Sequence, residues 1–86
     1  MNIVYILIEP EVDPVAFATF ADAKASVLER YREELDMQEE EAQGWPIASE
    51  VDVPESPTGV TYLYIEKGID IYIYRLPIIP PSSQLG

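Results

Sequence analysis

The residues able to take part in binding or catalysis are nearly all carboxylates. The chain of 86 residues holds 16 Asp and Glu against 5 Lys and Arg, with no His and no Cys, and its net charge is -11. The commonest general base, the thiolate nucleophile and the preferred zinc ligands are therefore missing. The glycine patterns of phosphate-binding and dinucleotide-binding loops are missing as well. We expect no enzymatic activity, no catalytic residue, no cofactor and no metal site.

Acidic residues recur at helical spacing in the middle of the chain. Side chains three or four positions apart on a helix lie about 5–6 Å from each other. Nucleic-acid strands carry phosphates at a repeat of several ångströms, so a row of such carboxylates can mimic nucleic acid in a basic protein groove. The predicted partner-binding surface comprises Glu29, Glu33, Glu34, Asp36, Glu39, Glu40 and Glu41. The alternative is a solvated helix face whose charge serves only solubility or adaptation to high salt.

The surplus of negative charge also limits the class of partner. A net charge of -11 repels nucleic acids and anionic membranes and attracts basic protein surfaces. No stretch approaches the roughly 18 apolar residues that span a bilayer, and the start of the chain lacks the basic residues of a signal peptide. We expect a cytoplasmic protein that binds a basic protein surface and binds neither nucleic acid nor membrane directly.

The first half of the chain predicts a strand followed by a helix. Residues 3–8 are continuously apolar, which favours a buried strand, and the prolines of residues 9–14 favour a loop. A helix is expected after Thr19, because Thr19 and Asp22 have capping-box spacing, and its end is expected between residues 37 and 43. The apolar stripe of this helix comprises Phe20, Ala23, Val27, Leu28, Tyr31 and Leu35.

The second half predicts three strands and a tail. Residues 45–53 alternate loosely between apolar and polar, which favours an edge strand, and residues 60–66 and 69–76 flank Lys67-Gly68 as a hairpin. Residues 77–86 are a Pro/Ser-rich tail, so the domain is expected to span residues 1–76. The predicted fold class is α+β, with a single helix packed on one face of a mostly antiparallel three- or four-stranded sheet in the order β-α-β-β-β.

Tyrosines fall on one face of the predicted hairpin. Side chains alternate between faces along a strand, which places Leu63, Ile65, Ile71 and Ile73 beneath the helix and Tyr62, Tyr64, Tyr72 and Tyr74 on the opposite face. One helix cannot cover both faces, so the tyrosines are candidates for a homodimer or partner interface. The alternatives are a tyrosine ladder that serves only sheet packing and a tail that folds back over the rings through residues 77–80.

The segments Asn2–Ile8 and Ala18–Ala25, with the closing hairpin, resemble small accessory proteins encoded by bacteriophages. Many of those proteins begin with a short apolar strand, continue into a helix that starts Phe-x-x-Ala-Lys, and end in a β-hairpin. Their acidic members look like anti-CRISPR or anti-restriction inhibitors, which block a host nuclease at its nucleic-acid channel. The resemblance implies an inhibitor in the host-cell cytoplasm and transfers no site residue. The alternative function is a small homo-oligomeric structural or accessory subunit assembled through the tyrosines.

Overall fold

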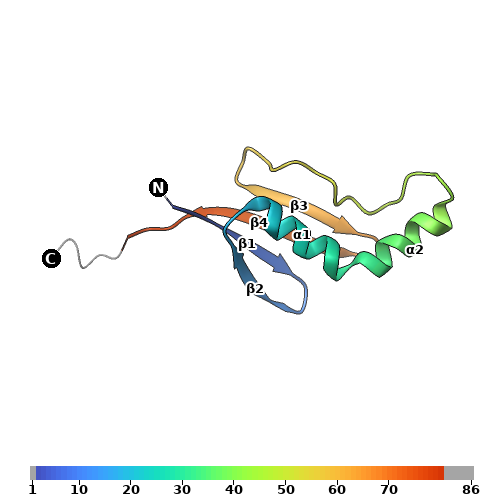
Figure 1. Ribbon diagram of the computed structural model, residues 1–86, viewed down its shortest axis with the longest axis horizontal. Coiled ribbons are helices and arrows are strands. Elements are labelled where there is room, and N and C mark those ends of the chain that lie inside the picture. Colours follow the sequence, from blue (N-terminus) through green and yellow to red (C-terminus); the bar gives the residue numbers. More distant parts are fainter. Residues whose placement is uncertain (1, 81–86) are drawn as a thin grey trace.

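The computed structural model describes residues 2–80, which form one antiparallel sheet and two helices (Figure 1). In chain order the elements are β1 (Ile3–Glu9), β2 (Val12–Phe17), α1 (Phe20–Arg30), α2 (Arg32–Ala42), β3 (Val60–Ile65) and β4 (Ile69–Pro77). The sheet has the order β2-β1-β4-β3, so each edge strand pairs with its hairpin partner and the chain's first and last described strands lie in the centre. The α+β class with a four-stranded antiparallel sheet is confirmed, whereas the single helix and the β-α-β-β-β order are wrong.

Residues 9–14 do not form the predicted loop, because β2 begins at Val12 directly after a tight turn. Glu11 takes a positive φ of 59° in that turn, which helps to reverse the chain within two residues. The Asn-Gly or Asp-Gly signal usual for such hairpins is absent here. Pro14 is tolerated within β2 because an edge strand is hydrogen-bonded on one side only.

Residues 43–59 form an irregular return segment rather than the predicted edge strand. Its one β-bridge to the sheet is at Glu50, which exchanges two backbone hydrogen bonds of 2.7 and 2.9 Å with Tyr64 of β3. Val51 and Val53 turn inward and pack against the core. The loose alternation in the sequence therefore reflects valines that cover the core from the side, and the segment shields part of the free edge of β3.

The helical region divides at Tyr31 instead of running straight. The φ of -107° and ψ of 17° at Tyr31 depart from helical values. Its amide nevertheless donates to the Val27 carbonyl at 3.1 Å, and its carbonyl accepts from the Leu35 amide at 2.9 Å. The break is thus a bend in a nearly continuous helix, with α1 lying on the sheet and α2 continuing past it (Figure 1).

Both predicted ends of the helical region are confirmed. The Thr19 hydroxyl accepts a hydrogen bond from the Asp22 amide at 3.1 Å, which satisfies one of the free amides of the first turn. At the other end α2 stops at Ala42, and Gln43 takes the left-handed conformation with its amide bonded to the Glu39 carbonyl.

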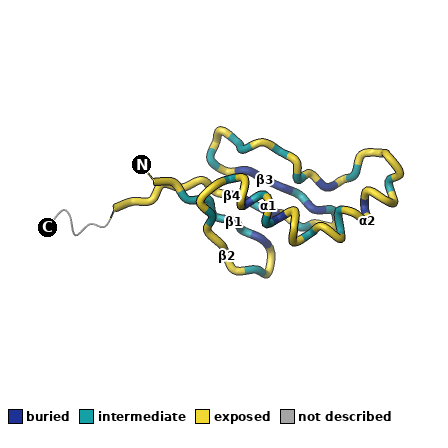
Figure 2. The backbone as a smooth tube through the Cα atoms, viewed as in Figure 1, coloured by how far each residue is buried: buried dark blue, intermediate teal, exposed yellow. Residues whose placement is uncertain are grey.

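The core lies between α1 and one face of the sheet. Its buried members are Leu7, Ala23, Val27, Leu63, Ile65, Ile71 and Ile73. All four hairpin residues predicted to lie beneath the helix are among them, so the predicted assignment of faces is confirmed. Figure 2 shows the buried positions gathered along β3 and in the middle of the molecule, with most of α2 and the return segment exposed.

The C-terminal part of the described chain leaves the sheet. Pro77 still pairs with Ile3, so β4 extends one residue beyond the predicted hairpin strand, and the Ile78 amide donates to the Asn2 carbonyl at 2.9 Å. Residues 78–80 then extend away from the sheet and do not fold back over the tyrosines (Figure 1). Residues 81–86 of the predicted tail lie outside the described residues.

The core assignment is tested by Ile71→Ala. Ile71 is 0% exposed, so truncation leaves a cavity and is expected to lower the free energy of unfolding by about 2–5 kcal/mol. Ile79→Ala makes the same chemical change at a side chain that is 76% exposed and is expected to change stability by less than about 0.5 kcal/mol. Urea denaturation followed by circular dichroism measures both. Equal losses in the two variants would contradict the described core.

Candidate functional site

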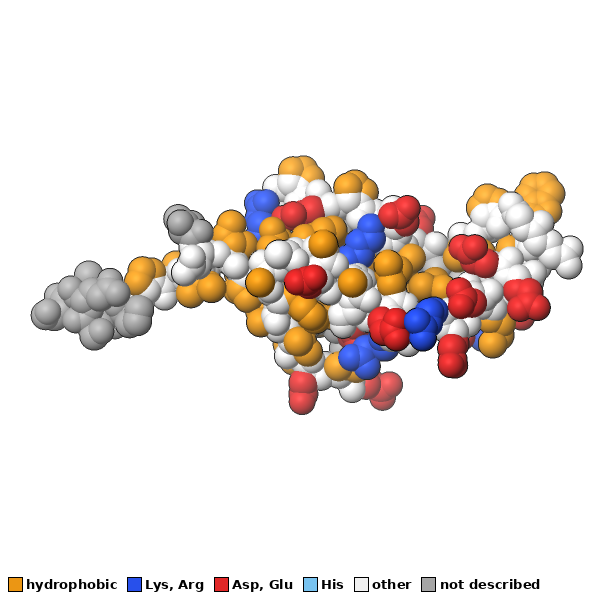
Figure 3. Space-filling model, in the orientation of Figure 1, with side chains coloured by type: hydrophobic (Ala, Val, Ile, Leu, Met, Phe, Trp, Pro, Cys, Tyr) orange, Lys and Arg blue, Asp and Glu red, His pale blue; other side chains and the backbone are white. Residues whose placement is uncertain are grey.

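The acidic surface predicted from the sequence lies almost wholly on α2, which is called the acidic arm below. This helix carries six acidic side chains and one arginine. Its exposed carboxylates are Glu33, Asp36, Glu39, Glu40 and Glu41, with Glu34 half-buried. Figure 3 shows acidic side chains gathered at the end of the molecule that α2 forms. Only Glu29 of the predicted surface lies on α1, where Arg32 neutralises it at 3.0 Å.

The cationic side chains neutralise acids away from the arm's carboxylates. The ion pairs are Lys24–Asp52 at 3.0 Å, Arg30–Glu9 at 2.6 Å, Arg32–Glu29 at 3.0 Å and Arg75–Glu55 at 3.3 Å. Within residues 2–80, none of the carboxylates of α2 takes part in an ion pair. These four cations, Arg32 of α2 among them, therefore pair with acids outside α2, so no ion pair in the described chain neutralises a carboxylate of the acidic arm.

Three exposed carboxylates of the arm form a row. Glu33, Asp36 and Glu40 are three and four positions apart in one helix, which places neighbours about 5–6 Å from each other. Glu29 does not continue this row, because the bend at Tyr31 intervenes and Arg32 compensates its charge. Like charges at this spacing weaken a helix by about 0.2–0.5 kcal/mol per pair. Stability alone does not favour such a pattern.

A buried polar cluster attaches the acidic arm to the sheet. Gln38, the buried residue of α2, accepts a hydrogen bond from the Ser49 hydroxyl at 2.6 Å. The same hydroxyl oxygen accepts from the Glu66 amide at 2.8 Å, just beyond β3. Gln38 also donates to the Glu34 carboxylate at 3.4 Å. These bonds join α2, the return segment and the sheet, so they fix where the arm's carboxylates stand.

A buried carboxylate holds the chain just before the bend. Glu9 ends β1 with its side chain 1% exposed, and Arg30 Nε, from the last residue of α1, lies 2.6 Å from Glu9 Oε2. The approach is poorly directed, so both carboxylate oxygens lack a hydrogen-bond donor among the described residues. Burial raises the pKa of Glu9, and the Arg30 charge acts in the opposite direction. Burial also raises the pKa of Tyr31, with a further upward contribution from the charge of Glu9 and a downward one from Arg30.

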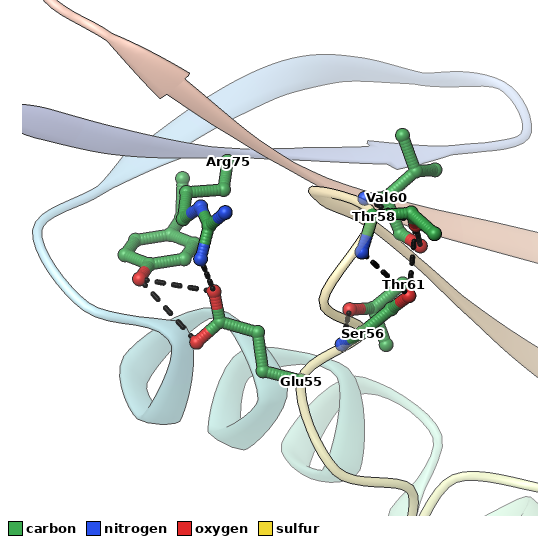
Figure 4. A network of polar contacts seen from close by, with 7 residues as sticks. Glu55, Ser56, Thr58, Val60, Thr61 and Arg75 are labelled. Carbon is green, nitrogen blue, oxygen red and sulfur yellow. Dashed lines mark hydrogen bonds and ion pairs between the residues drawn. The ribbon is translucent and has the colours of Figure 1, made fainter.

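Polar contacts around Glu55 fasten the end of the return segment (Figure 4). The Glu55 carboxylate accepts from the Tyr5 hydroxyl at 3.3 Å and from Arg75 at 3.3 Å, and the Ser56 amide donates to Thr61 Oγ1 at 2.9 Å. Burial raises the pKa of Tyr5, the Glu55 charge raises it further, and Arg75 lowers it. A shallow groove of about 710 Å³ lies beside Tyr5, and its one carboxylate is this already engaged Glu55.

Two exposed apolar side chains, one on the acidic arm and one just beyond its end, were not singled out by the charge pattern. Trp45 is 79% exposed and Met37 is 54% exposed. Trp45 follows the end of α2, and its amide donates to the Ala42 carbonyl at 3.0 Å. Tryptophan is enriched among the residues that dominate interface energies. The position of Trp45 between Gly44 and Pro46 is the sequence feature that could have indicated its exposure, because such a context favours a turn rather than the start of a strand.

The predicted tyrosines lie together on the sheet face opposite α1, called the open face below, and their residues are Tyr62, Tyr64, Tyr72 and Tyr74. Ring centroids are 5.4 Å apart for Tyr62 and Tyr72 and 6.3 Å apart for Tyr72 and Tyr74. The Tyr62 hydroxyl donates to Asp70 at 2.6 Å, and this bond to a carboxylate raises the pKa of Tyr62 to about 12. The tyrosines therefore make real cross-strand contacts, and Tyr62 and Tyr74 remain 46% and 36% exposed.

Metal, membrane and family relationships add no further assignment. Among residues 2–80, no group of three or more potential ligand residues converges on a metal position. Neither helix of that region has the length and apolar character needed to cross a bilayer. Comparison of the chain with protein-family models, curated proteins and solved structures found no match. The resemblance to phage-encoded inhibitors therefore stays a prediction.

The attachment of the arm is tested by Ser49→Ala. Loss of the hydroxyl leaves buried Gln38 and the Glu66 amide without this partner, which is expected to cost about 1–3 kcal/mol. Hydrogen exchange is expected to accelerate more in α2 than in α1, because the cluster joins α2 to the sheet. Ser26→Ala, in α1 and outside the cluster, is the control. Unchanged protection of α2 in Ser49→Ala would show that the cluster does not hold the arm.

The buried carboxylate is tested by Glu9→Gln. A pKa raised by burial means that the folded state favours protonated Glu9, so this contribution to stability is present at low pH and is lost as the pH rises through the raised pKa. The unfolding free energy of the natural chain, minus that of Glu9→Gln, is expected to fall as the pH rises from about 4 through the raised pKa. Groups common to both chains cancel in this difference. A difference that rises with pH would mean that the Arg30 pair outweighs burial.

Proposed function

We propose that this protein is a non-enzymatic inhibitor that binds the basic surface of a nucleic-acid-handling complex through its acidic arm. The observation that carries the proposal is the separation of charge. The cations of the ion pairs neutralise acids outside the arm, while the described part of the chain offers no ion-pair partner to the carboxylates of α2. A groove lined with Lys and Arg for phosphate binding attracts such a surface.

The position of α2 supports entry into such a groove. The acidic arm continues past the sheet, so its carboxylates can approach a concave partner before the body of the domain meets it (Figure 1). An α-helix with side chains is about 10–12 Å across. Its row of Glu33, Asp36 and Glu40 offers regularly spaced anions on a rigid support, in the manner of a nucleic-acid mimic.

Charge and apolar contact have separate roles in this binding. Exposed carboxylates speed association and select basic partners, but each exposed pair adds little affinity because water and salt screen it. Trp45, with 79% of its surface exposed, supplies the apolar area that can anchor the complex. The carboxylates therefore attract and orient the basic partner, and Trp45 accounts for much of the lifetime of the complex.

The acidic arm is tested with the triple variant Glu33→Gln, Asp36→Asn, Glu40→Gln. Bacterial CRISPR effectors and restriction nucleases are loaded with a fluorescent DNA duplex, and its displacement is followed by anisotropy over a salt series. We expect the natural chain to displace the duplex from a member of this panel, and the triple variant to do so roughly tenfold or more weakly, because three charge contacts are lost. Rising salt is expected to weaken displacement by the natural chain.

The matched control is Glu11→Gln, Asp13→Asn, Asp22→Asn, which removes three exposed charges from the β1–β2 hairpin and the first turn of α1 and leaves every carboxylate of α2 in place. It is expected to behave like the natural chain. Trp45 is the only tryptophan, so its emission is expected to shift to shorter wavelength on binding. Equal weakening by both triple variants would attribute inhibition to net charge alone, and displacement that is indifferent to both variants would eliminate the acidic arm as the binding site.

A further inference from the structure

The open face is apolar and nearly free of charge. Its cross-strand neighbours are Ile6–Ala16, Val4–Leu76, Ile6–Tyr74, Ile8–Tyr72, Val60–Tyr74, Tyr62–Tyr72 and Tyr64–Asp70. Asp70 is the one ionised group in this set, and the Tyr62 hydroxyl already satisfies it at 2.6 Å. In a chain with a net charge of -11, a sheet face of this composition stands apart from the rest of the surface.

Exposure on this face is continuous across neighbouring strands. Val60, Tyr62, Tyr74 and Leu76 are 38%, 46%, 36% and 44% exposed. Both helices lie away from it, since α1 packs on the opposite side and α2 contacts α1. Residues 78–80 extend away from the sheet. The largest apolar patch on a soluble monomer is typically about 300–600 Å² and is often functional, so a continuous face of this kind is a candidate interaction site.

Association through the sheet edges is disfavoured. Glu50 occupies part of the free edge of β3 with its two backbone hydrogen bonds to Tyr64. At the other edge, Pro14 removes an amide from β2 and the β1–β2 register shifts between Leu7 and Glu9. Prolines and irregular register are features that prevent edge-to-edge pairing. Contact through the open face is therefore the available mode of sheet association.

We propose that a second copy of this chain covers the open face, so that two sheets pack face to face in a symmetric dimer. A basic partner finds no anionic surface there beyond Asp70, whereas an identical face offers tyrosine rings and aliphatic side chains to its own equivalents. A two-fold axis that lies in the plane between the two faces makes the contact self-complementary. The acidic arms, which leave the sheet past α1, stay outside this contact.

The area of the face places the dimer among the smaller specific interfaces. Four strands spaced about 4.8 Å apart, each of about seven residues, give a flat sheet area of about 450 Å² per chain. This area does not count the surface that the projecting side chains add. Two faces therefore bury on the order of 1,000 Å², which is the lower end for specific interfaces. Each copy also repels the other through its net charge of -11, and salt screens that repulsion. We expect a weak, reversible dimer that strengthens as salt is raised.

This salt dependence is opposite to that of binding by the acidic arm. Dimerisation does not rest on the proposed inhibitory function, and each can fail without the other. A dimer would present two acidic arms, which raises avidity for any partner with two basic sites in reach.

Sedimentation velocity of the full chain, over a series of protein and salt concentrations, tests the proposal. The natural chain is expected to shift from monomer to dimer as either concentration rises. Tyr74→Glu places like charges on both sides of the contact and is expected to weaken dimerisation at least about tenfold. Leu76→Glu is a second variant nearer the end of β4, in case Tyr74→Glu does not fold, and circular dichroism checks each. Met37→Glu adds the same charge at a 54% exposed side chain on α2 and is expected to dimerise like the natural chain.

Cross-linking identifies the face directly, because the chain contains no cysteine of its own. Tyr74→Cys, on the central strand β4 beside Ile6 of β1, is expected to yield a covalent dimer with a short bismaleimide, because central positions lie nearest a two-fold axis, and Met37→Cys is not. A monomer at every protein and salt concentration would overturn the proposal. So would a dimer that persists in folded Leu76→Glu and Tyr74→Glu, or one that is lost equally in Met37→Glu.

Discussion

The packing of α1 against the apolar face of the sheet is the contact on which the rest of the molecule depends. Ala23 and Val27 of α1 are fully buried there. The hairpin strands contribute Leu63 and Ile71, which are fully buried, and Ile73, which is nearly so. At 11 residues, α1 is only about 16 Å long, so it can close one face of a four-stranded sheet and nothing more. The consequences are an open second face and a second helix that passes beyond the sheet.

The two surfaces left by this packing have different chemistry. The open face holds tyrosine and aliphatic side chains with Asp70 as its ionised group, while α2 holds carboxylates without ion-pair partners in the described chain. Apolar contact between like-charged copies is aided by salt, and attraction to a basic partner is reduced by it. One small domain can therefore carry two kinds of association that respond to ionic strength in opposite directions.

Buried polar contacts, together with Leu35 packed against the core, set the direction of the acidic arm. Gln38 and Ser49 join α2 to the return segment, and Glu9 holds Arg30 beside the bend. A buried ion pair is weak support for stability, because desolvation opposes the attraction between its charges. Its contribution here is geometric, since the pair ties Arg30, the last residue of α1, to Glu9 at the end of β1, immediately before α2 begins.

The sequence by itself determined the local pattern. Alternation placed Leu63, Ile65, Ile71 and Ile73 on one face of the hairpin, Thr19 marked the helix start, and the acidic residues at helical spacing marked the arm. These features depend on neighbours within a few residues, so periodicity and capping chemistry reveal them.

Tertiary structure alone decided the remainder. Residues 12–17 form a strand because they pair with β1 at the edge of the sheet, where Pro14 is tolerated. Residues 45–53 do not form a strand, because Val51 and Val53 cover the core and Glu50 alone among them forms a β-bridge with β3. The bend at Tyr31, the pairing of Lys24, Arg30 and Arg75 with distant acids and the exposure of Trp45 likewise depend on the tertiary arrangement. Such long-range contacts leave no periodic trace in the sequence, because burial and hydrogen bonding with remote partners override local propensity.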